Sequence, residues 1–266
     1  MKHRLSNRIR LSKSLRTFEL TRREVLGFLG GAATVSLSGC LRNTVAISPQ
    51  PISEAAQSSQ QVAPAGSPAC IVRPEQTAGP YFVDERLNRA DVRSDPGSGA
   101  IKSGIPLRLV FQVSQIGSSA CTPLSNATVD IWHCDAEGVY SDVNDRRFST
   151  VGQKFLRGYQ TTDTNGVAEF VAIYPGWYPG RTVHIHFKIR TADQTDTQSY
   201  EFTSQLYFDD AITDRVHAQA PYGPREQRQR NSQDGIFQGG GEQLMLQLTE
   251  AEVGYVGRFE IGLEIA

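Results

Sequence analysis

Residues 174–189 place two imidazoles, the phenol of Tyr178 and a guanidinium within sixteen consecutive positions. The part from 182 to 189 reads as a β-strand, in which side chains two positions apart share a face, so His184 and His186 point the same way. Tyr178 lies in the Pro- and Gly-rich turn just before this strand. Two imidazoles beside a phenol can converge on one metal ion. The stretch therefore predicts a metal site without specifying the metal.

Short β-strands and the turns between them must position these side chains. Much of the chain is rich in β-forming residues with partial alternation, and turns rich in Gly, Pro and Asp separate the segments. Helix caps followed by long runs of 3.6-residue period are almost absent. The pattern predicts an all-β fold, a β-sandwich of short strands with long loops. Strands are expected at residues 107–113, 127–133, 155–161, 167–173, 182–189, 204–208, 244–248 and 258–265.

Three connections in this scheme carry expectations of their own. Residues 115–126 are expected to form a hairpin-like connection between the first two strands. Residues 135–140 form a turn that delivers a second phenol, Tyr140. Residues 214–241 are polar and end in three consecutive glycines, which predicts a long surface excursion of open role, with His217 on its surface.

Composition limits the classes of protein to consider. The chain has 266 residues, of which 39% are hydrophobic, and a formal net charge of −1, so it can form one substantial domain and does not resemble a nucleic-acid binder. The cysteines, Cys40, Cys70, Cys121 and Cys134, include no Cys-x-x-Cys, which disfavours a zinc ribbon. Pairing of Cys121 with Cys134 is disfavoured because they would lie near opposite ends of one strand, whereas Cys70 could pair with either.

The N-terminal segment resembles an export signal. Basic residues dominate positions 1–23, where Glu19 is the single acid, and the apolar run 25–39 follows. A membrane-spanning anchor is the alternative, but fifteen residues with four glycines are short for a span. Residues 21–26 resemble a twin-arginine signal, and residues 37–40 resemble a lipobox.

These features predict the organisation of the chain and its location. We expect an export signal over residues 1–39, a flexible tether rich in Ser, Gln, Ala and Pro over residues 40–69, and a folded domain over residues 70–266. The protein is expected in the periplasm or cell envelope. Membrane contact is expected only through a lipid on Cys40.

The order of the phenols, the His-x-His pair and the segments around them resembles the intradiol ring-cleavage dioxygenases, the family of catechol and protocatechuate dioxygenases. The similarity covers roughly residues 74–210 and points to the exported, single-domain branch of the family. Any one piece is weak alone, but the composite is highly specific. The matching segments are 129–132, 138–140, 157–158, 162–163 with Gly166, 175–179, 181–187 and 204–208.

The resemblance implies a non-haem Fe(III) bound by Tyr140, Tyr178, His184 and His186. Hard phenolates stabilise ferric over ferrous iron, while neutral imidazoles keep the charge of the site low enough to accept a dianionic catecholate. It also implies that Tyr178 acts as the base that takes a proton from the substrate. The implied catalytic domain spans residues 70–266.

The same resemblance assigns residues around the substrate. Arg181 is implied to stabilise the ketonised, carbanion-like substrate, and Gln205 to lie beside it. A loop comprising Gly79, Pro80 and Tyr81 is implied to pack against the bound ring. The implied reaction is intradiol cleavage of a catechol-type aromatic by O2 to a cis,cis-muconate-type diacid.

Some features leave the substrate and the assembly open. Only five residues separate Tyr178 from His184, a shorter link than in the soluble protocatechuate enzymes, so the catechol derivative that is cleaved is not specified. The oligomeric state is also left open by the sequence. His133, beside the strand at 127–133, is expected to be packed or hydrogen-bonded rather than a fifth ligand.

Three rival interpretations use the same residues. The His-x-His pair could be an ordinary polar strand face. A copper-zinc superoxide dismutase is also a β-sandwich with such a strand, but it requires more histidines than the four outside the signal, His133, His184, His186 and His217. A non-catalytic aromatic-binding lipoprotein on a degenerate dioxygenase fold is the alternative function, although degeneration would be expected to lose at least one ligand.

Overall fold

The computed structural model describes residues 71–118, 120–191, 200–223 and 227–265. These residues belong to one compact unit within residues 61–266. The export signal predicted at 1–39, the tether predicted at 40–69 and Cys70 lie outside the described residues. Within the described ranges, no helix has the length and apolar character needed to cross a membrane.

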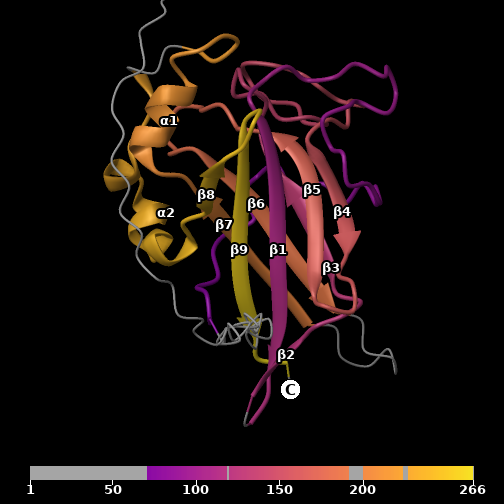
Figure 1. Ribbon diagram of the computed structural model, residues 1–266. Coiled ribbons are helices and arrows are strands. Elements are labelled where there is room, and N and C mark those ends of the chain that lie inside the picture. Colours follow the sequence, from indigo (N-terminus) through magenta and orange to yellow (C-terminus); the bar gives the residue numbers. More distant parts are fainter. Residues whose placement is uncertain (1–70, 119, 192–199, 224–226, 266) are drawn as a thin grey trace, which may run out of the picture. The chain divides into compact units, whose positions relative to one another are not determined.

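Strands dominate the described chain, and the short helices are concentrated towards its C-terminal end (Figure 1). The elements in chain order are β1 (Pro106–Ile116), β2 (Cys121–Pro123), β3 (Thr128–Trp132), β4 (Arg157–Thr161), β5 (Val167–Ile173), β6 (His184–Thr191), β7 (Tyr200–Tyr207), α1 (Asp210–Val216), η2 (Asn231–Gln233), α2 (Gly235–Gln238), η3 (Gly241–Leu244), β8 (Gln247–Glu250) and β9 (Tyr255–Leu263).

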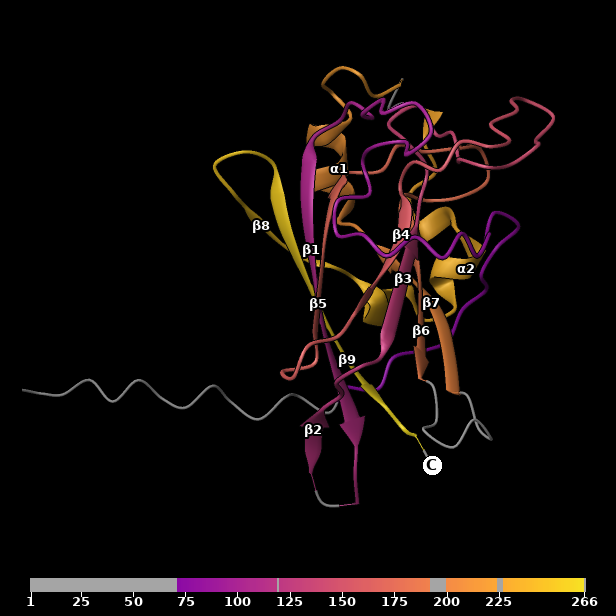
Figure 2. The ribbon, with the colours of Figure 1, turned by 90° about the vertical axis from the view of Figure 1, so that its right-hand side faces the viewer.

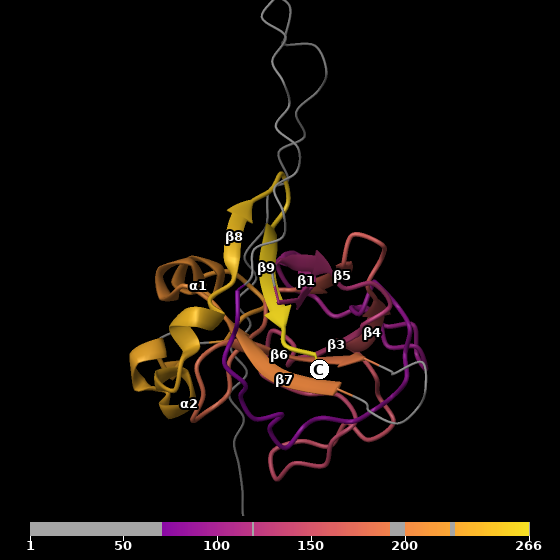
Figure 3. The same ribbon diagram turned by 90° about the horizontal axis from the view of Figure 1, so that it is seen from below.

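The strands form two sheets that face each other. One has the order β2-β1-β9-β8, with β5 also paired to β1, and the other has the order β4-β3-β6-β7. The β1–β9 pair is parallel, whereas the other described pairs are antiparallel. Figure 2 shows the two layers edge-on, and Figure 3 shows them from below. The predicted β-sandwich is confirmed.

Aromatic side chains join the two sheets across the core. The ring of Phe187 in β6 lies 5.5 Å from that of Phe111 in β1 and 5.4 Å from that of Phe259 in β9. Each fully buried phenylalanine of this kind stabilises the fold by roughly 1.5–3 kcal/mol. Ile185 and Ile189 are fully buried in the same core. Because side chains alternate along a strand, His184 and His186 lie on the opposite face of β6.

The expected connection between the first two strands needs a correction. Residues 114–116 of β1 pair with residues 121–123 of β2 through the turn at Gly117, but β3 belongs to the other sheet. Asn126 adopts a left-handed φ of 62°, and the chain leaves the first sheet there. The segment therefore forms a short hairpin, in which the three residues of β2 pair with the end of β1. After this hairpin the chain crosses to the other sheet, where β3 begins.

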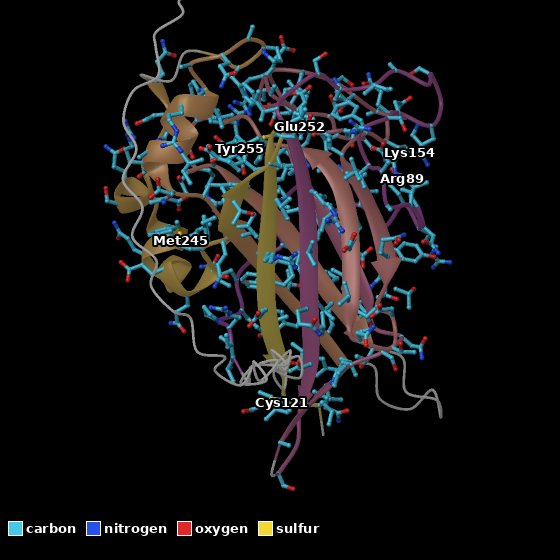
Figure 4. All side chains as sticks on the ribbon, in the orientation of Figure 1. Arg89, Cys121, Lys154, Met245, Glu252 and Tyr255 are labelled. Carbon is cyan, nitrogen blue, oxygen red and sulfur yellow. The ribbon has the colours of Figure 1, made fainter. Side chains whose placement is uncertain are left out.

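Cys121, labelled in Figure 4, lies in β2 and is disulfide-bonded. Cys134 is a buried free thiol. These two cysteines do not pair with each other, as expected. The predicted involvement of Cys70 lies outside the described residues.

The region expected to be a long surface excursion has many exposed residues but contains short helical turns, and the expectation that His217 lies on its surface was wrong. α1 runs into it, and η2, α2 and η3 follow beside β7 and β8 (Figure 1). His217 is buried rather than exposed: its Nε2 lies 3.0 Å from the Pro175 carbonyl oxygen, and its ring stacks on Tyr222. Helices of four and seven residues are too short to show a 3.6-residue period.

The C-terminal strands are shifted from their expected positions. Leu244, expected to begin a strand, instead ends η3, and β8 begins only at Gln247. Met245, labelled in Figure 4, lies between them. The last strand was expected at 258–265 and begins earlier, at Tyr255.

Candidate metal centre

His184 and His186 lie in the middle of the four-stranded sheet, where β6 is flanked by β3 and β7. The register places Trp132 and Gln205 directly opposite His186 on the two neighbouring strands. Both imidazoles are almost fully buried although they point away from the sandwich core. The loops that cover this outer face of the sheet therefore complete the site.

The two imidazoles present ring nitrogens to each other. Their Nε2 atoms are 3.1 Å apart. His184 Nδ1 lies 2.7 Å from the Thr182 carbonyl oxygen, which can only accept, so Nδ1 carries the hydrogen and Nε2 of the neutral ring is an acceptor with a lone pair. Burial and the nearby Arg181 lower the pKa of His184 to about 3. Burial and His184 lower the pKa of His186 well below its usual value. Both rings are therefore neutral near pH 7, as metal ligands must be.

The two predicted phenol ligands lie beside this pair. The Tyr178 hydroxyl is 3.1 Å from His184 Nε2. The ring of Tyr140 lies 5.7 Å from that of Tyr178 and 6.4 Å from that of His186. The hydroxyl of Tyr140 is buried and has no hydrogen-bond partner among the described residues. A buried polar atom of this kind costs about 1–3 kcal/mol unless something satisfies it.

Two tight turns bring Tyr140 and Tyr178 together. Gly138 has φ of 80°, and a Cβ atom there would overlap the carbonyl oxygen of Trp177. A Cβ atom at Gly176 would overlap backbone atoms of the turn that begins at Asp135. The two glycines thus let the turns pack backbone against backbone, which a side chain at either position would prevent.

Asp135 organises the turn that carries Tyr140. Its Oδ1 accepts hydrogen bonds from the backbone N–H groups of Glu137 and Val139, each at 3.0 Å. Its Oδ2 lies 2.9 Å from Lys102 Nζ, and its carbonyl oxygen accepts from Gly176 N–H at 3.0 Å. One buried carboxylate residue therefore holds both turns in register.

The loop at residues 77–82 covers the site. Gly79 has φ of 68° and lies so close to the His186 ring that a Cβ would come 3.1 Å from Cε1. Tyr81 stacks on Tyr140 at 4.6 Å, and its hydroxyl donates to Asp145 Oδ2 at 2.8 Å. Gly79 thus lies against His186 and Tyr81 against Tyr140, so this loop contacts two of the predicted ligands. The sequence had predicted only a contact of this loop with the substrate.

Arg181 and Gln205, both predicted to act on the substrate, are in contact. Arg181 Nη2 donates to Gln205 Oε1 at 2.6 Å, and Gln205 Nε2 donates to the Thr77 carbonyl oxygen at 3.0 Å. Burial alone would lower the Arg181 pKa, but the neighbouring Tyr178 and Asp234 raise it above its usual value. The guanidinium is therefore a permanent positive charge beside the histidine and tyrosine cluster.

A cavity of about 320 Å³ opens beside Tyr178. Trp177, Phe148 and Arg147 are among the residues that line it. Its volume is at the lower end of the range for small-molecule sites. Tyr178 lines this cavity, whereas Tyr140 is enclosed with 1% of its surface exposed.

The donor set fits a metal ion. In the described part of the chain, no three or more His, Cys, Asp or Glu side chains form a group that could hold a metal, so phenol oxygens are needed to complete a set around the histidine pair. The unsatisfied Tyr140 hydroxyl and the Nε2 lone pair of His184, which the Tyr178 hydroxyl approaches to 3.1 Å, belong to the same cluster of side chains. His133 is buried beside the site and its Nδ1 donates to the Cys134 carbonyl oxygen at 2.8 Å. That contact is consistent with its expected packed, hydrogen-bonded state.

Sequence reasoning missed several residues that support the cluster. Asp234 and Asp145 hold Arg181 and Tyr81 through their carboxylates, and Asp135 shapes the Tyr140 turn. Only Asp234 had a recognisable signal, because an Asp just before Gly-Ile-Phe is a typical helix N-cap. The other two contacts depend on chain segments that meet only in the fold.

Comparisons with known proteins identify the family of this chain. Residues 77–230 match the sequence model of the family described as dioxygenase. The beta chain of protocatechuate 3,4-dioxygenase from Burkholderia cepacia is 30% identical over 138 residues, which are 48% of this chain and 56% of that protein. The chain thus spans about half the length of the curated relative that it matches.

Two solved structures resemble the whole folded region. The intradiol ring-cleavage dioxygenase from Tetranychus urticae has a TM-score of 0.61 and 27% identity, covering 73% of this chain and 95% of that one. The dioxygenase domain of a carbohydrate-binding fusion protein from Streptomyces sp. SirexAA-E has a TM-score of 0.52 and 28% identity, covering 74% and 100%. Since the family match alone includes more than half of the chain, the protein belongs to the intradiol ring-cleavage dioxygenases, a family of oxidoreductases.

Proposed function

We propose that this chain cleaves a catechol-type ring between its two hydroxyl-bearing carbons, with O2 as oxidant and a non-haem Fe(III) held by Tyr140, Tyr178, His184 and His186. Both atoms of O2 enter the product, a cis,cis-muconate-type diacid. The observation that carries the proposal is the buried, unsatisfied Tyr140 hydroxyl beside two imidazoles whose Nε2 atoms are 3.1 Å apart. A buried hydroxyl without a well-placed partner costs free energy, which a metal ion bound to its oxygen would recover.

Ferric iron would supply Lewis acidity that draws electron density from the bound diol and makes a ring carbon reactive towards O2. The protein's own residues then have separate tasks. Tyr178, whose side chain lines the cavity, would take the proton of a substrate hydroxyl. Tyr140 is enclosed and stacked under Tyr81, so it has no comparable access and would remain a fixed ligand.

Arg181 and Gln205 would act on the ring itself. The guanidinium is held by Gln205 on one side and by Asp234 on the other, so it is oriented before substrate arrives. A fixed positive charge beside the ring stabilises negative charge that develops on the substrate oxygens and ring carbons. Trp177 and Phe148 give the cavity beside Tyr178 an aromatic wall, but Arg181 and Gln205 are not among the residues that line it.

We also propose that the chain is exported through its twin-arginine-like signal and anchored by a lipid on Cys40, as the sequence pattern of residues 1–40 suggests. Export of a folded protein suits an enzyme that acquires its metal first. Replacement of both Arg22 and Arg23 by Lys should leave the protein in the cytoplasm. Cys40→Ser should release it from the membrane fraction, and unchanged fractionation of either variant would contradict the corresponding step.

The decisive experiment uses purified protein reconstituted with ferric iron. Tyrosinate-to-iron charge transfer should give a wine-red colour that shifts when catechol is added without O2, and adding O2 should then produce the diacid. A non-catalytic aromatic-binding protein would show the colour shift without O2 consumption. A colourless, iron-free preparation that stays inert towards catechols would refute the proposal.

A further inference from the structure

One buried carboxylate links the helical region after β7 to the metal centre. Asp234 has 1% of its surface exposed. Its Oδ1 caps α2 by accepting from the backbone N–H groups of Ile236 at 2.8 Å and Phe237 at 3.3 Å. Its Oδ2 accepts from Arg181 Nε at 2.9 Å and from the Thr182 backbone N–H at 2.8 Å. The same residue therefore serves a helix end with one oxygen and the segment before β6 with the other.

The second oxygen controls the direction of the Arg181 side chain. Arg181 follows a turn whose residues Pro179 and Gly180 are exposed, so the local chain does not by itself enclose the side chain. Fixing a free arginine costs up to about 2 kcal/mol of side-chain entropy. Asp234 holds Nε, and Gln205 holds Nη2 at 2.6 Å, so two contacts from different segments select one orientation of the guanidinium.

The same segment also holds the residue between Arg181 and the first histidine of the site. Thr182 donates its backbone N–H to Asp234, and its hydroxyl donates to Asn231 Oδ1 at 2.6 Å. The carbonyl oxygen of Thr182 in turn accepts from His184 Nδ1. Figures 2 and 3 show α2 near β7.

We propose that Asp234 is a positioning residue of the ring-cleavage reaction, which holds the Arg181 guanidinium where charge develops on the substrate. The proposal rests on the proposed function. It gives residues 231–234 a role in the active site rather than only in the helical region around it. The alternative is that Asp234 has only a structural role as the N-cap of α2. Another N-cap of this chain provides a matched control for that alternative.

The control is Asp209, the N-cap of α1. Its Oδ1 accepts from the backbone N–H groups of Ala211 at 2.8 Å and Ile212 at 2.9 Å, the same two-bond cap that Asp234 gives α2. It has no described side-chain contact with Arg181 or the histidines. Serine is a good N-cap but too short to reach the guanidinium, so Asp→Ser at each site keeps a cap. At Asp234 the change removes the ion pair with Arg181 and also the acceptor of the Thr182 backbone N–H.

Steady-state turnover of catechol by the ferric-loaded full chain tests the proposal. Asp234→Ser should keep the iron content and the resting visible spectrum of the wild type, because no predicted ligand is altered. Its kcat should fall roughly ten- to hundredfold, since a displacement of about 1 Å at a reacting centre has effects of that size. KM, and the catechol affinity measured from the anaerobic colour shift, should change less than about threefold. Asp209→Ser should stay within about twofold of wild type in every measurement.

A double-mutant cycle separates positioning from a structural role. If Asp234 acts through Arg181, adding Asp234→Ser to Arg181→Gln should cause no further loss of kcat, because the group to be positioned is gone. Effects that multiply instead would overturn the proposal. If Asp234→Ser fails to fold, Asp234→Asn serves in the same cycle, since it keeps one oxygen and removes the charge.

The remaining outcomes also decide the question. A wild-type protein active on catechol, with Asp234→Ser no slower than Asp209→Ser, overturns the role of Asp234 and leaves the proposed function intact. Loss of iron from Asp234→Ser also overturns it, because the residue would then act on the metal site. A ferric-loaded wild type that is colourless and inert towards catechols overturns the proposed function itself, and this inference with it.

Discussion

The indole of Trp132 and the imidazole of His186 stack with centroids 5.1 Å apart and only 3° between their planes. The two residues lie directly opposite each other on β3 and β6. The stack therefore fixes the plane in which His186 presents Nε2 to the other proposed ligands. Gly79 lies against the same ring, so the imidazole has little freedom to rotate. The sheet thus contributes to the orientation of a proposed ligand through a cross-strand pair.

Loss of the indole should weaken both the fold and the metal site. Trp132 is 1% exposed, so Trp132→Ala should destabilise the protein by about 3–5 kcal/mol and lower its iron affinity. Trp132→Phe is the control, because it keeps an aromatic face and the indole Nε1 has no described hydrogen bond to lose. Denaturant unfolding and iron content measure the two effects. Iron affinity of the Ala variant equal to that of wild type would show that the stack does not orient His186.

Removal of the Tyr140 hydroxyl should have opposite effects on stability and on metal binding. The hydroxyl is buried without a described partner, so Tyr140→Phe should stabilise the metal-free protein by about 1 kcal/mol. The same change should abolish stable ferric binding and the visible colour, because one proposed ligand is gone. Unfolding of the metal-free protein and iron analysis after reconstitution provide the test. A destabilised metal-free variant that still binds ferric iron would contradict the assigned role.

The sequence predicted the sandwich because its strands carry their own signal. Alternation in residues 167–173 reproduces β5 residue for residue, and the apolar residues of β6 lie in the core as expected. Burial of the polar residues on the other face of β6, His184, His186 and Lys188, does not follow from the alternation. The helices after β7 were missed because they are too short for periodicity to appear. The order of the strands in the sheets was harder to predict. The sequence of the turn at Gly117 does not indicate whether the strand after it pairs in the same sheet or joins the other one.

The candidate site divides in a similar way. Tyr140, Tyr178, His184 and His186 were identified because their types and order match a known pattern, and the structure brings all four together. Asp234 escaped notice because its partner, Arg181, lies 53 residues away. Contacts between distant loops have no periodicity or fixed spacing, so only the folded chain reveals them.

Gly138 lies where the turn that carries Tyr140 packs against the turn that carries Tyr178, and it should not tolerate any side chain. Gly138→Ala combines an unfavourable φ of 80° with overlap on the Trp177 carbonyl oxygen, so it should push the turns apart and disrupt iron binding. Gly99→Ala is the matched control, since φ there is 72° and nothing lies within 4 Å of the added methyl. The control should cost about 1–2 kcal/mol from backbone strain alone and keep its iron. Equal loss in both variants, measured by unfolding and iron content, would refute the steric argument.

Acid should remove a stabilising contribution of Asp95. This buried carboxylate accepts from Lys154 N–H at 2.6 Å, Ser98 N–H at 2.8 Å and the Ser98 hydroxyl at 2.9 Å. The Lys154 N–H, with the Ser98 groups, holds its pKa below the usual 3.8 although burial opposes them. A depressed folded-state pKa stabilises the protein above the unfolded pKa, and this contribution disappears as the pH falls through the folded one.

The difference in unfolding free energy between wild type and Asp95→Asn should therefore be constant above about pH 5 and shrink as the pH falls below about 4. Chemical denaturation of both proteins at a series of pH values measures it. Metal-free protein should be used throughout, so that loss of a bound metal in acid does not contribute. A difference that stays constant, or grows, as the pH falls would mean that the Asp95 carboxylate is not stabilised by these hydrogen bonds in the folded state.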